Sequence, residues 1–304
     1  MNKEIIAQLR EIVSEEHVLI QEPMKNHTTF RIGGPAACFV RPQDAGQVER
    51  ILHICRRYAA PWFVLGNGSN LLVSDRGFDG VIIQIYRNMS RIRTEGGRLT
   101  AQAGALLSAA AKRALKEGLT GLEFASGIPG TVGGAVVMNA GAYGGEMKDV
   151  VESATVLDKE GNLLRLDTEQ LQMGYRTSVV KKKEYTVLEA VLKLTQGDPS
   201  VIGARMEELK EQRVLKQPLE YPSAGSTFKR PEGYFAGKLI MDSGLRGFRV
   251  GGAQISEKHC GFVINTGDAT ARDVVQLIRQ VQDTVYEKFH VKLEPEVRFL
   301  GEFQ

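Results

Sequence analysis

Apolar residues recur along the chain at two spacings, and each spacing predicts one kind of element. Side chains three or four positions apart indicate amphipathic helices, whereas alternation and short apolar runs indicate strands. Helical spacing is present at 5–13, 48–55, 105–116, 199–216, 234–241 and 270–289. Strands are expected at 26–35, 37–41, 63–65, 71–73, 80–83, 91–103 (a pair), 151–157, 163–166, 185–194, 248–250, 253–255, 262–264 and 291–300. The mixture predicts an α/β or α+β protein.

Capping and turn residues divide this pattern into parts. Asp44 and Thr168 are placed to cap helices, and Gly118 is placed to end one. The strongest break is Gln196-Gly197-Asp198-Pro199, a turn signal between a long strand and a long helix. We therefore expect three parts: a first lobe at 1–88, a second lobe at 89–198 that the C-terminal strand 291–304 joins, and a third domain at 199–290.

Composition narrows the class of protein. The chain has 304 residues and a net charge of +3, with 42% hydrophobic and 25% charged residues, which is typical of globular proteins. No dense basic stripe with interleaved aromatics indicates nucleic-acid binding, and no apolar run reaches the length of a membrane span. The N-terminus is charged and amphipathic, without the apolar core of a signal peptide, so a cytoplasmic protein is expected.

Cysteine and histidine usage argues against cross-links and metals. Cys38, Cys55 and Cys260 are odd in number and far apart, which favours a reducing compartment. The five histidines show no pair four residues apart, and His259-Cys260 is isolated. No metal site is therefore expected.

The stretch from Gly121 to Gly145 is the most unusual part of the chain. It contains eight glycines and one charged residue, Glu123, and it interleaves them with apolar residues, unlike a flexible linker. Glycine allows positive φ and close approach to a ligand. Because no Lys or Arg is present, an anion here would be held by main-chain N–H groups. The spacing matches neither G-x-G-x-x-G nor the P-loop.

A second glycine segment, Gly66-Asn67-Gly68-Ser69-Asn70, follows the expected strand at 63–65. Successive N–H groups, a hydroxyl and an amide suit a pyrophosphate. The same letters are also typical of a β-hairpin with an Asn-Gly turn. The residues alone leave the two interpretations open.

Seven ordered segments together resemble one family. They are NHTTFRIGG (26–34), LGNGSNLLVSD (65–75), GIPGTVGGAVVMNAGAYGGE (127–146), YRTS (175–178), SAGSTFKRP (223–231), GGAQISEKHCGFVIN (251–265) and LEPEVRFLG (293–301). The chain is similar, over about 26–301, to the UDP-N-acetylenolpyruvoylglucosamine reductases, also called UDP-N-acetylmuramate dehydrogenases. The short spacing from Tyr185 to Pro199 resembles the shorter subtype.

The resemblance implies an α+β fold: a two-lobed FAD-binding fold of the vanillyl-alcohol-oxidase (PCMH) type plus a C-terminal α+β substrate-binding domain. It implies FAD as cofactor and NADPH as reductant. The expected reaction turns UDP-N-acetylglucosamine enolpyruvate into UDP-N-acetylmuramate, a cytoplasmic step of peptidoglycan precursor synthesis. No membrane, nucleic acid or obligate protein partner is implied.

The resemblance also implies three catalytic residues. Arg176 is the cation for the substrate carboxylate, because its planar fork matches that group. Ser226 is the proton donor to the carbon that becomes enolate-like after hydride addition. Glu296 assists the enolate, which a carboxyl can do only when it holds a proton, so a raised pKa is expected. Taken singly, Arg176 and Ser226 are more typical of a surface arginine and a turn hydroxyl, and Glu296 is also compatible with a glutamate paired with Arg298.

Binding residues follow from the same match. Those expected to bind FAD are Arg31, Gly66, Asn67, Gly68, Ser69, Asn70, Ser126, Gly127, Ile128, Pro129, Gly130, Gly133, Gly134 and Asn139. Those expected to bind the UDP-sugar are Tyr175, Arg213, Lys216, Lys229 and Lys238, although basic residues of this kind are more often surface charges.

Two other functions stay open. An FAD-dependent oxidase of the same fold would act on an alcohol or lactone; the glycine segments contain no His or Cys for covalent flavin, which does not exclude that activity. A regulator that binds a UDP-sugar without flavin would not need the combination of Arg176, Ser226 and Glu296.

Overall fold

The computed structural model describes residues 2–303, which contain nine α-helices and nineteen strands. The helices are α1 Lys3–Val13, α2 Ala45–Arg57, α3 Leu107–Lys116, α4 Val132–Met138, α5 Thr168–Leu171, α6 Val179–Lys183, α7 Pro199–Lys216, α8 Ala236–Asp242 and α9 Ala271–Phe289. The strands are β1 Val18–Pro23, β2 Pro35–Val40, β3 Trp62–Leu65, β4 Leu71–Val73, β5 Phe78–Gln84, β6 Ile92–Glu95, β7 Arg98–Gln102, β8 Leu119–Thr120, β9 Gly141–Ala142, β10 Gly145–Glu146, β11 Val151–Leu157, β12 Leu163–Asp167, β13 Thr186–Lys193, β14 Thr195–Gln196, β15 Ser223–Ser226, β16 Arg249–Val250, β17 Ala253–Ile255, β18 Phe262–Asn265 and β19 Arg298–Leu300. The five-stranded sheet and the sheet that contains β15 to β18 are antiparallel, as expected of an α+β protein.

The described residues form two compact units, each with its own hydrophobic core. Unit 1 comprises 2–19, 38–67 and 80–213. Unit 2 comprises 20–37, 68–79 and 214–303. The three-part division expected from the sequence stays a prediction.

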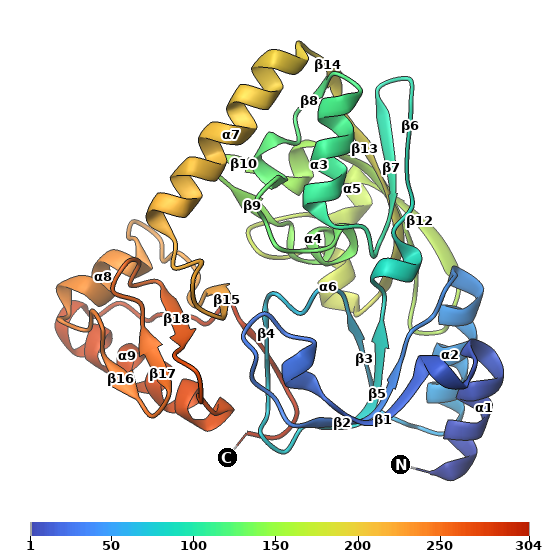
Figure 1. The fold of residues 1–304 in the computed structure, drawn as a ribbon, viewed down its shortest axis with the longest axis horizontal. Helices are drawn as coiled ribbons and strands as arrows, with labels where there is room; N and C mark the ends of the chain where they lie inside the picture. The colour runs from blue at the N-terminus through green and yellow to red at the C-terminus, as the bar shows by residue number, and fades with distance from the viewer. Residues whose placement is uncertain (1, 304) are drawn as a thin grey trace. The chain divides into compact units, whose positions relative to one another are not determined.

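Unit 1 is built on a five-stranded antiparallel sheet of order β12-β11-β13-β7-β6 (Figure 1). The β11–β12 hairpin closes with Leu157 opposite Leu163, around the turn that the sequence indicated. Helix α4 packs against β13, and α1 packs against α2. Strand β3 runs parallel to β5, with Trp62 opposite Val81. Strand β3 ends at Leu65, immediately before the turn that begins at Gly66.

Unit 2 contains an antiparallel sheet of order β15-β18-β17-β16, and α9 packs against β16 and β17 (Figure 1). A separate parallel pair joins β19 to β4, with Arg298 opposite Leu71. This pair places the residues just before β19 next to the residues just before β4. Glu296 and Asn70 are therefore neighbours in space.

Asp75 ties the segment 68–79 to helix α9. Its two carboxylate oxygens accept hydrogen bonds from the N–H groups of Ala271 (2.8 Å) and Arg272 (3.0 Å), in the first turn of the helix. These donors have no partner within the helix. We expect Asp75→Ala to destabilise unit 2 by about 2 kcal/mol, because two charge-assisted caps are lost. Urea unfolding measures the change.

A matched control is Asp283→Ala, which removes an exposed carboxylate in the middle of the same helix. This change should stay within about 0.5 kcal/mol of the unchanged protein. Equal stability of the two variants would contradict the role given to Asp75.

Some expected elements differ from the structure. The strand predicted at 26–35 is wrong: Arg31 has φ of 55° and Gly33 has φ of 137°, values that no strand accommodates, and β2 begins only at Pro35. The strand predicted at 291–300 is confined to its last three residues. The short helix α5 is capped by Asp167 rather than by Thr168. Strand β1 and helix α6 were not predicted.

The glycine stretch contains a helix that the sequence did not indicate. Thr131 caps α4 by accepting from the Gly134 N–H at 3.3 Å. A Cβ at Gly133 would lie 2.7 Å from the Cβ of Ala103, so glycine lets this helix approach β7 closely. Two adjacent glycines, which weaken an isolated helix, are therefore used for packing.

Within residues 2–303 no helix is long and apolar enough to cross a membrane. The same residues hold no group of three or more His, Cys, Asp or Glu side chains placed to bind a metal ion. The three cysteines are free and buried, and burial raises the pKa of Cys38 to about 11 and that of Cys55 to about 12. These two thiols are protonated and unreactive at neutral pH.

Candidate functional site

The two glycine segments meet in unit 1. The Asn67 side chain donates through Nδ2 to the Pro129 carbonyl at 2.7 Å. A Cβ at Gly66 would lie only 2.5 Å from Oγ1 of Thr131. Glycine is therefore required at position 66 for the turn after β3 to lie against the segment that precedes α4. The contact brings together two segments that sequence analysis assigned to one ligand.

The turn at 66–70 has main-chain donors to offer. No N–H group of residues 66–70 donates to an acceptor elsewhere in residues 2–303. Gly68 has φ of 64°, and a Cβ there would lie 2.1 Å from the His27 carbonyl oxygen. The Gly68 carbonyl in turn accepts from the Thr29 N–H at 3.2 Å. The segment at 26–34 thus packs against this turn. The N–H groups of the turn are suited to binding a pyrophosphate.

In the second glycine segment, fewer N–H groups are available than the sequence suggested. Val132 and Gly133 donate to carbonyls that precede α3, at 2.8 Å each, and Gly134 donates to Thr131. Ser126 and Ile128 donate within their own turn. The remaining candidates for an anion are the N–H groups of Gly127, Gly130 and Thr131.

Arg213 lies against this segment. A Cβ at Gly127 would lie 2.6 Å from its Nη1 atom. Burial lowers the pKa of the guanidinium from its usual range, because desolvation disfavours the charged form. A partly buried cation beside uncharged main chain suits a phosphate-bearing ligand.

Asn139 was assigned to the cofactor, but its side chain is used within the protein. It is fully buried at the end of α4, with φ of 43°. Its Nδ2 donates to Glu146 at 2.6 Å and to the Gly174 carbonyl at 3.0 Å, and its Oδ1 accepts from the Lys148 N–H at 2.9 Å. These contacts favour a structural role.

Arg176 stands on a tight turn. Gly174 and Thr177 exchange two main-chain hydrogen bonds, of 3.0 and 3.2 Å, and Arg176 between them has φ of 55°. Its guanidinium donates to the Gly141 carbonyl at 3.3 Å and lies 5.3 Å from the ring centroid of Tyr175. Positive φ is unfavourable for a long side chain. An arginine kept in that conformation is a candidate functional residue.

In unit 2, Ser226 and Glu296 belong to adjacent segments. Ser226 ends β15, and its hydroxyl donates to the Phe228 carbonyl at 3.2 Å. The next residue, Thr227, accepts from the Glu296 N–H at 2.8 Å. The Glu296 carbonyl accepts from Asn70 Nδ2 at 3.2 Å. The structure thus brings Ser226, Glu296 and Asn70 together.

Contacts distinguish Glu296 from Glu294. Glu294 is exposed and forms an ion pair with Lys229, whereas Glu296 is partly buried beside Thr227. The two glutamates do not lie on a common strand, because β19 starts at Arg298. Glu294 therefore forms a surface ion pair with Lys229, whereas Glu296 lies close to Ser226 in the structure.

The other candidate residues are distributed over unit 2. Lys238 pairs with Asp242 at 2.7 Å, one helical turn away in α8. Arg31 and Lys216 are exposed. Ser69 lies between Gly68 and Asn70 in the turn already described. None of these positions by itself indicates a ligand.

His259 was missed as a neighbour of Ser226. A Cβ at Gly261 would lie 3.0 Å from Cε1 of His259 and 3.5 Å from Oγ of Ser226, so both side chains border Gly261. The Gly261 N–H donates to Nδ1 of the ring at 3.1 Å. Burial lowers the pKa of His259. The imidazole is therefore neutral at pH 7; no sequence spacing linked it to Ser226.

The pKa of His259 predicts how stability depends on pH. Its pKa is lower in the folded than in the unfolded state, where it is about 6.5. Above that value neither state binds the proton, and no stability is lost. As the pH falls below about 6.5 the unfolded state is protonated first, so the free energy of unfolding decreases. Urea unfolding between pH 8 and 5 should show a smaller decrease in His259→Gln than in the unchanged protein.

The control for this prediction is His53→Gln, which alters an exposed histidine of α2. It should retain the full decrease in stability. A His259→Gln profile that coincides with that of the unchanged protein would contradict the assignment.

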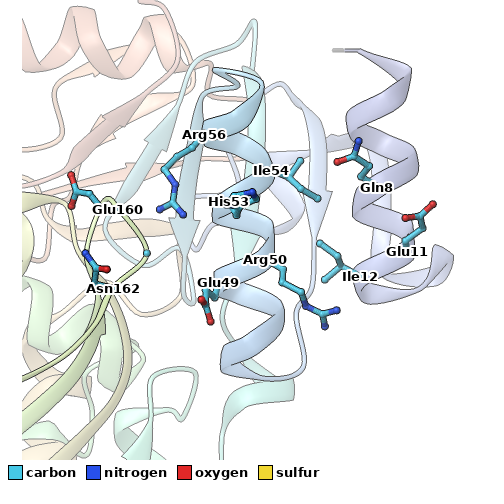
Figure 2. Close-up of a pocket in the computed structure, with 11 residues that line it drawn as sticks. Gln8, Glu11, Ile12, Glu49, Arg50, His53, Ile54, Arg56, Glu160 and Asn162 are labelled. Atoms are coloured by element: carbon cyan, nitrogen blue, oxygen red, sulfur yellow. The ribbon is translucent and has the colours of Figure 1, made fainter.

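A surface hollow of about 720 Å³ is lined by residues of unit 1. Figure 2 shows it between α1, α2 and the turn that joins β11 to β12, with Glu11, Arg50, His53, Arg56 and Glu160 around it. Its lining mixes both charges, and Arg56 already donates to the Lys159 carbonyl at 2.6 Å. None of the candidate site residues lines this hollow.

Two family models match parts of this chain. Residues 36–167 match the model of an FAD binding domain, and residues 217–300 match the model of the C-terminal domain of UDP-N-acetylenolpyruvoylglucosamine reductase. The UDP-N-acetylenolpyruvoylglucosamine reductase of Lachnoclostridium phytofermentans is 55% identical over 99% of each chain.

Two solved structures are similar. The UDP-N-acetylenolpyruvylglucosamine reductase from Thermus caldophilus has a TM-score of 0.81 and 37% identity, over 93% of this chain and 98% of that one. A variant of Phl p 4, described as a glucose oxidase, has a TM-score of 0.52 and 13% identity, over 71% of this chain and 50% of that one. The second likeness concerns the fold alone. The predicted α+β arrangement, an FAD-binding part followed by a C-terminal domain, is confirmed.

Proposed function

The chain belongs to the family of UDP-N-acetylenolpyruvoylglucosamine reductases, and from this membership we propose that it reduces UDP-N-acetylglucosamine enolpyruvate to UDP-N-acetylmuramate with NADPH. The resemblance inferred from the sequence is thereby confirmed. The observation that supports the proposal most is the similarity to the Lachnoclostridium phytofermentans reductase, which is 55% identical over 99% of each chain. We also propose a cytoplasmic location and a place in peptidoglycan precursor synthesis.

The protein is a flavin-dependent oxidoreductase, and its cofactor is FAD. The residues present fit FAD. The N–H groups of the turn at 66–70 donate to no acceptor within residues 2–303, and the Asn67 side chain holds this turn against Pro129. We propose that these N–H groups and those of Gly127 and Gly130 hold the pyrophosphate. When bound, FAD supplies hydride transfer from NADPH to the substrate alkene.

Arg176 is proposed to bind the carboxylate of the enolpyruvyl group. Hydride addition at the terminal carbon leaves negative charge on the adjacent carbon and its carboxylate. A guanidinium fork on that carboxylate stabilises the charge as it develops. The Gly141 carbonyl, at 3.3 Å, holds the guanidinium and limits its freedom before substrate binds.

Ser226 is proposed to protonate the carbon next to the carboxylate. A serine hydroxyl is a weak acid, so it needs a strongly basic carbon beside it and groups that stabilise the alkoxide. In the structure its proton is directed to the Phe228 carbonyl, and the hydroxyl must turn from that acceptor to reach substrate. The net change is the addition of one hydride and one proton across the double bond.

Glu296 is proposed to assist as a protonated carboxyl near the developing enolate. Its partly buried position beside Thr227 supports this role better than the exposed position of Glu294 does. Arg213, Lys216, Lys229 and Lys238 are proposed to neutralise the diphosphate of the nucleotide, and Tyr175 to contact the sugar. Among these, Arg213 has the strongest support, from its burial beside Gly127.

Steady-state turnover with product analysis tests the function. The purified protein is mixed with NADPH and UDP-N-acetylglucosamine enolpyruvate, and the product is weighed by mass spectrometry. We expect one NADPH consumed for each product molecule, with the product two hydrogen atoms heavier than the substrate. NADPH consumption should require the UDP-sugar.

The same samples separate the alternative functions. A colourless protein that binds the UDP-sugar without converting it would identify a regulator. A yellow protein that consumes oxygen with an alcohol or lactone, and leaves the UDP-sugar unchanged, would identify an oxidase. Either result would overturn the proposal.

A further inference from the structure

Asn139 links the end of α4 to the turn that carries Arg176. Its amide donates to the Gly174 carbonyl at 3.0 Å and to Glu146 at 2.6 Å, while its oxygen accepts from the Lys148 N–H at 2.9 Å. Two donors and one acceptor are used, so the orientation of the amide is fixed by its partners. The side chain is fully buried, which makes each of these bonds costly to lose.

The turn at 174–177 needs such support. Arg176 has φ of 55°, which is unfavourable for a residue with a Cβ and must be maintained by the surroundings. Asn139 holds the Gly174 end of the turn, and the buried Ser178 hydroxyl, which donates to the Val137 carbonyl at 2.8 Å, holds the other end. Both supports come from the last residues of α4 and its C-cap.

The guanidinium is held from the same segment. Arg176 donates to the carbonyl of Gly141, two residues after Asn139, and Gly141 pairs with Glu146 across the β9–β10 ladder. Glu146 is also the carboxylate that accepts from the Asn139 amide. The main chain and the side chain of Arg176 are therefore oriented by one short stretch, 137–146, in which Asn139 is the buried connection.

We propose that Asn139 is a positioning residue for Arg176 and not a ligand of FAD. Its amide fixes the turn so that the guanidinium is presented in one orientation. This inference rests on the proposed function, because it takes Arg176 as the group that binds the substrate carboxylate. A displacement of about 1 Å at such a group can reduce a rate by about two orders of magnitude.

The test uses Asn139→Gly, because glycine keeps the positive φ of position 139 and removes only the amide. Binding of UDP-N-acetylglucosamine enolpyruvate to the oxidised holoenzyme is measured by calorimetry, without reductant. We expect the Kd to rise about tenfold to a hundredfold. FAD retention and the rate of flavin reduction by NADPH should stay within about twofold of the unchanged protein, a difference of about 0.4 kcal/mol.

A double-mutant cycle with Arg176→Gly shows whether the effect passes through Arg176. Adding Asn139→Gly to Arg176→Gly should change the Kd less than twofold. Full additivity of the two changes would overturn the inference, as would loss of FAD with an unchanged Kd for the UDP-sugar. If Arg176→Gly alone leaves substrate binding unchanged, the role proposed for Arg176 is wrong as well, which separates that failure from the failure of Asn139 alone.

Two further variants guard against a folding defect. Asn139→Asp keeps the shape and the acceptor for Lys148 but loses both donors, so it should weaken substrate binding as well. Asn162→Gly removes an exposed amide that donates to Asp158 at 2.9 Å and should leave the Kd unchanged. If Asn139→Gly does not fold, the cycle is run with Asn139→Asp; normal substrate binding in that variant would overturn the inference.

Discussion

Replacing Ser226 by alanine should slow reduction of the UDP-sugar by about 10²- to 10⁴-fold, the range that a positioned general acid contributes. Ser226 sits at the end of β15, with its hydroxyl 3.2 Å from the Phe228 carbonyl oxygen. Alanine removes the proton donor and leaves the strand intact. Flavin reduction by NADPH involves no proton from Ser226, so its rate should not change. Anaerobic rapid mixing measures the two half-reactions separately.

The matched control for this prediction is Ser223→Ala in the same strand. The main-chain carbonyl of Ser223 accepts from the hydroxyl of Thr29 at 2.7 Å, and alanine keeps that carbonyl, so loss of the side-chain oxygen should have little effect. Full turnover by Ser226→Ala, at the rate of Ser223→Ala, would remove Ser226 from the mechanism.

Replacing Arg176 by glycine should lower kcat/KM by about 10²-fold or more, because removal of one partner of a desolvated charge pair costs about 2–5 kcal/mol. The same change should leave the melting temperature unchanged or raise it. Glycine relieves a positive φ of 55° that costs a side-chain-bearing residue about 1–2 kcal/mol. Activity is thus expected to fall without a loss of stability. Steady-state kinetics and thermal unfolding measure them on one sample.

The variant Arg176→Lys tests whether positive charge alone is sufficient at this position. Lysine keeps a positive charge and the same backbone strain but lacks the fork that matches a carboxylate. Its kcat/KM should lie between those of the unchanged protein and the glycine variant. A lysine variant as slow as the glycine variant, with normal stability, would mean that the geometry of the fork matters and the charge alone does not. A glycine variant of full activity would exclude Arg176 from the site.

Local signals allowed much of the fold to be predicted. Asp44 accepts from the Gln47 N–H at 2.8 Å and caps α2 as expected, and Thr270 forms a capping box with Asp273 at the start of α9. The turn at 158–162 forms the predicted hairpin between β11 and β12. In each case the residues that decide the structure lie within a few positions of one another.

The errors arose where distant residues decide the conformation. The segment at 26–35 alternates like a strand, yet His27 must approach Gly68 and Arg31 must adopt positive φ, so the segment coils. Helix α4 contains two consecutive glycines, which indicate a loop when read alone. It forms because Thr131 caps it and because Gly133 can approach Ala103.

For the candidate site residues too, contacts between distant parts of the chain could not be predicted from the sequence. The resemblance, and no local spacing, indicated Ser226 and Glu296, and the structure explains their proximity through Thr227, whose carbonyl accepts from the Glu296 N–H. Neither signal indicated that the Asn139 amide is used within the protein, because its partners at 146 and 174 are set by the fold. His259 was passed over for the same reason.

The most direct measurement of the central claim is an anaerobic titration of the holoenzyme followed by visible absorbance. Flavin is first bleached with one equivalent of NADPH. UDP-N-acetylglucosamine enolpyruvate is then added in the absence of oxygen. We expect one equivalent of this alkene to restore the oxidised spectrum, as UDP-N-acetylmuramate forms in equal amount. A flavin that stays bleached with excess alkene and recovers only when air is admitted would contradict the account.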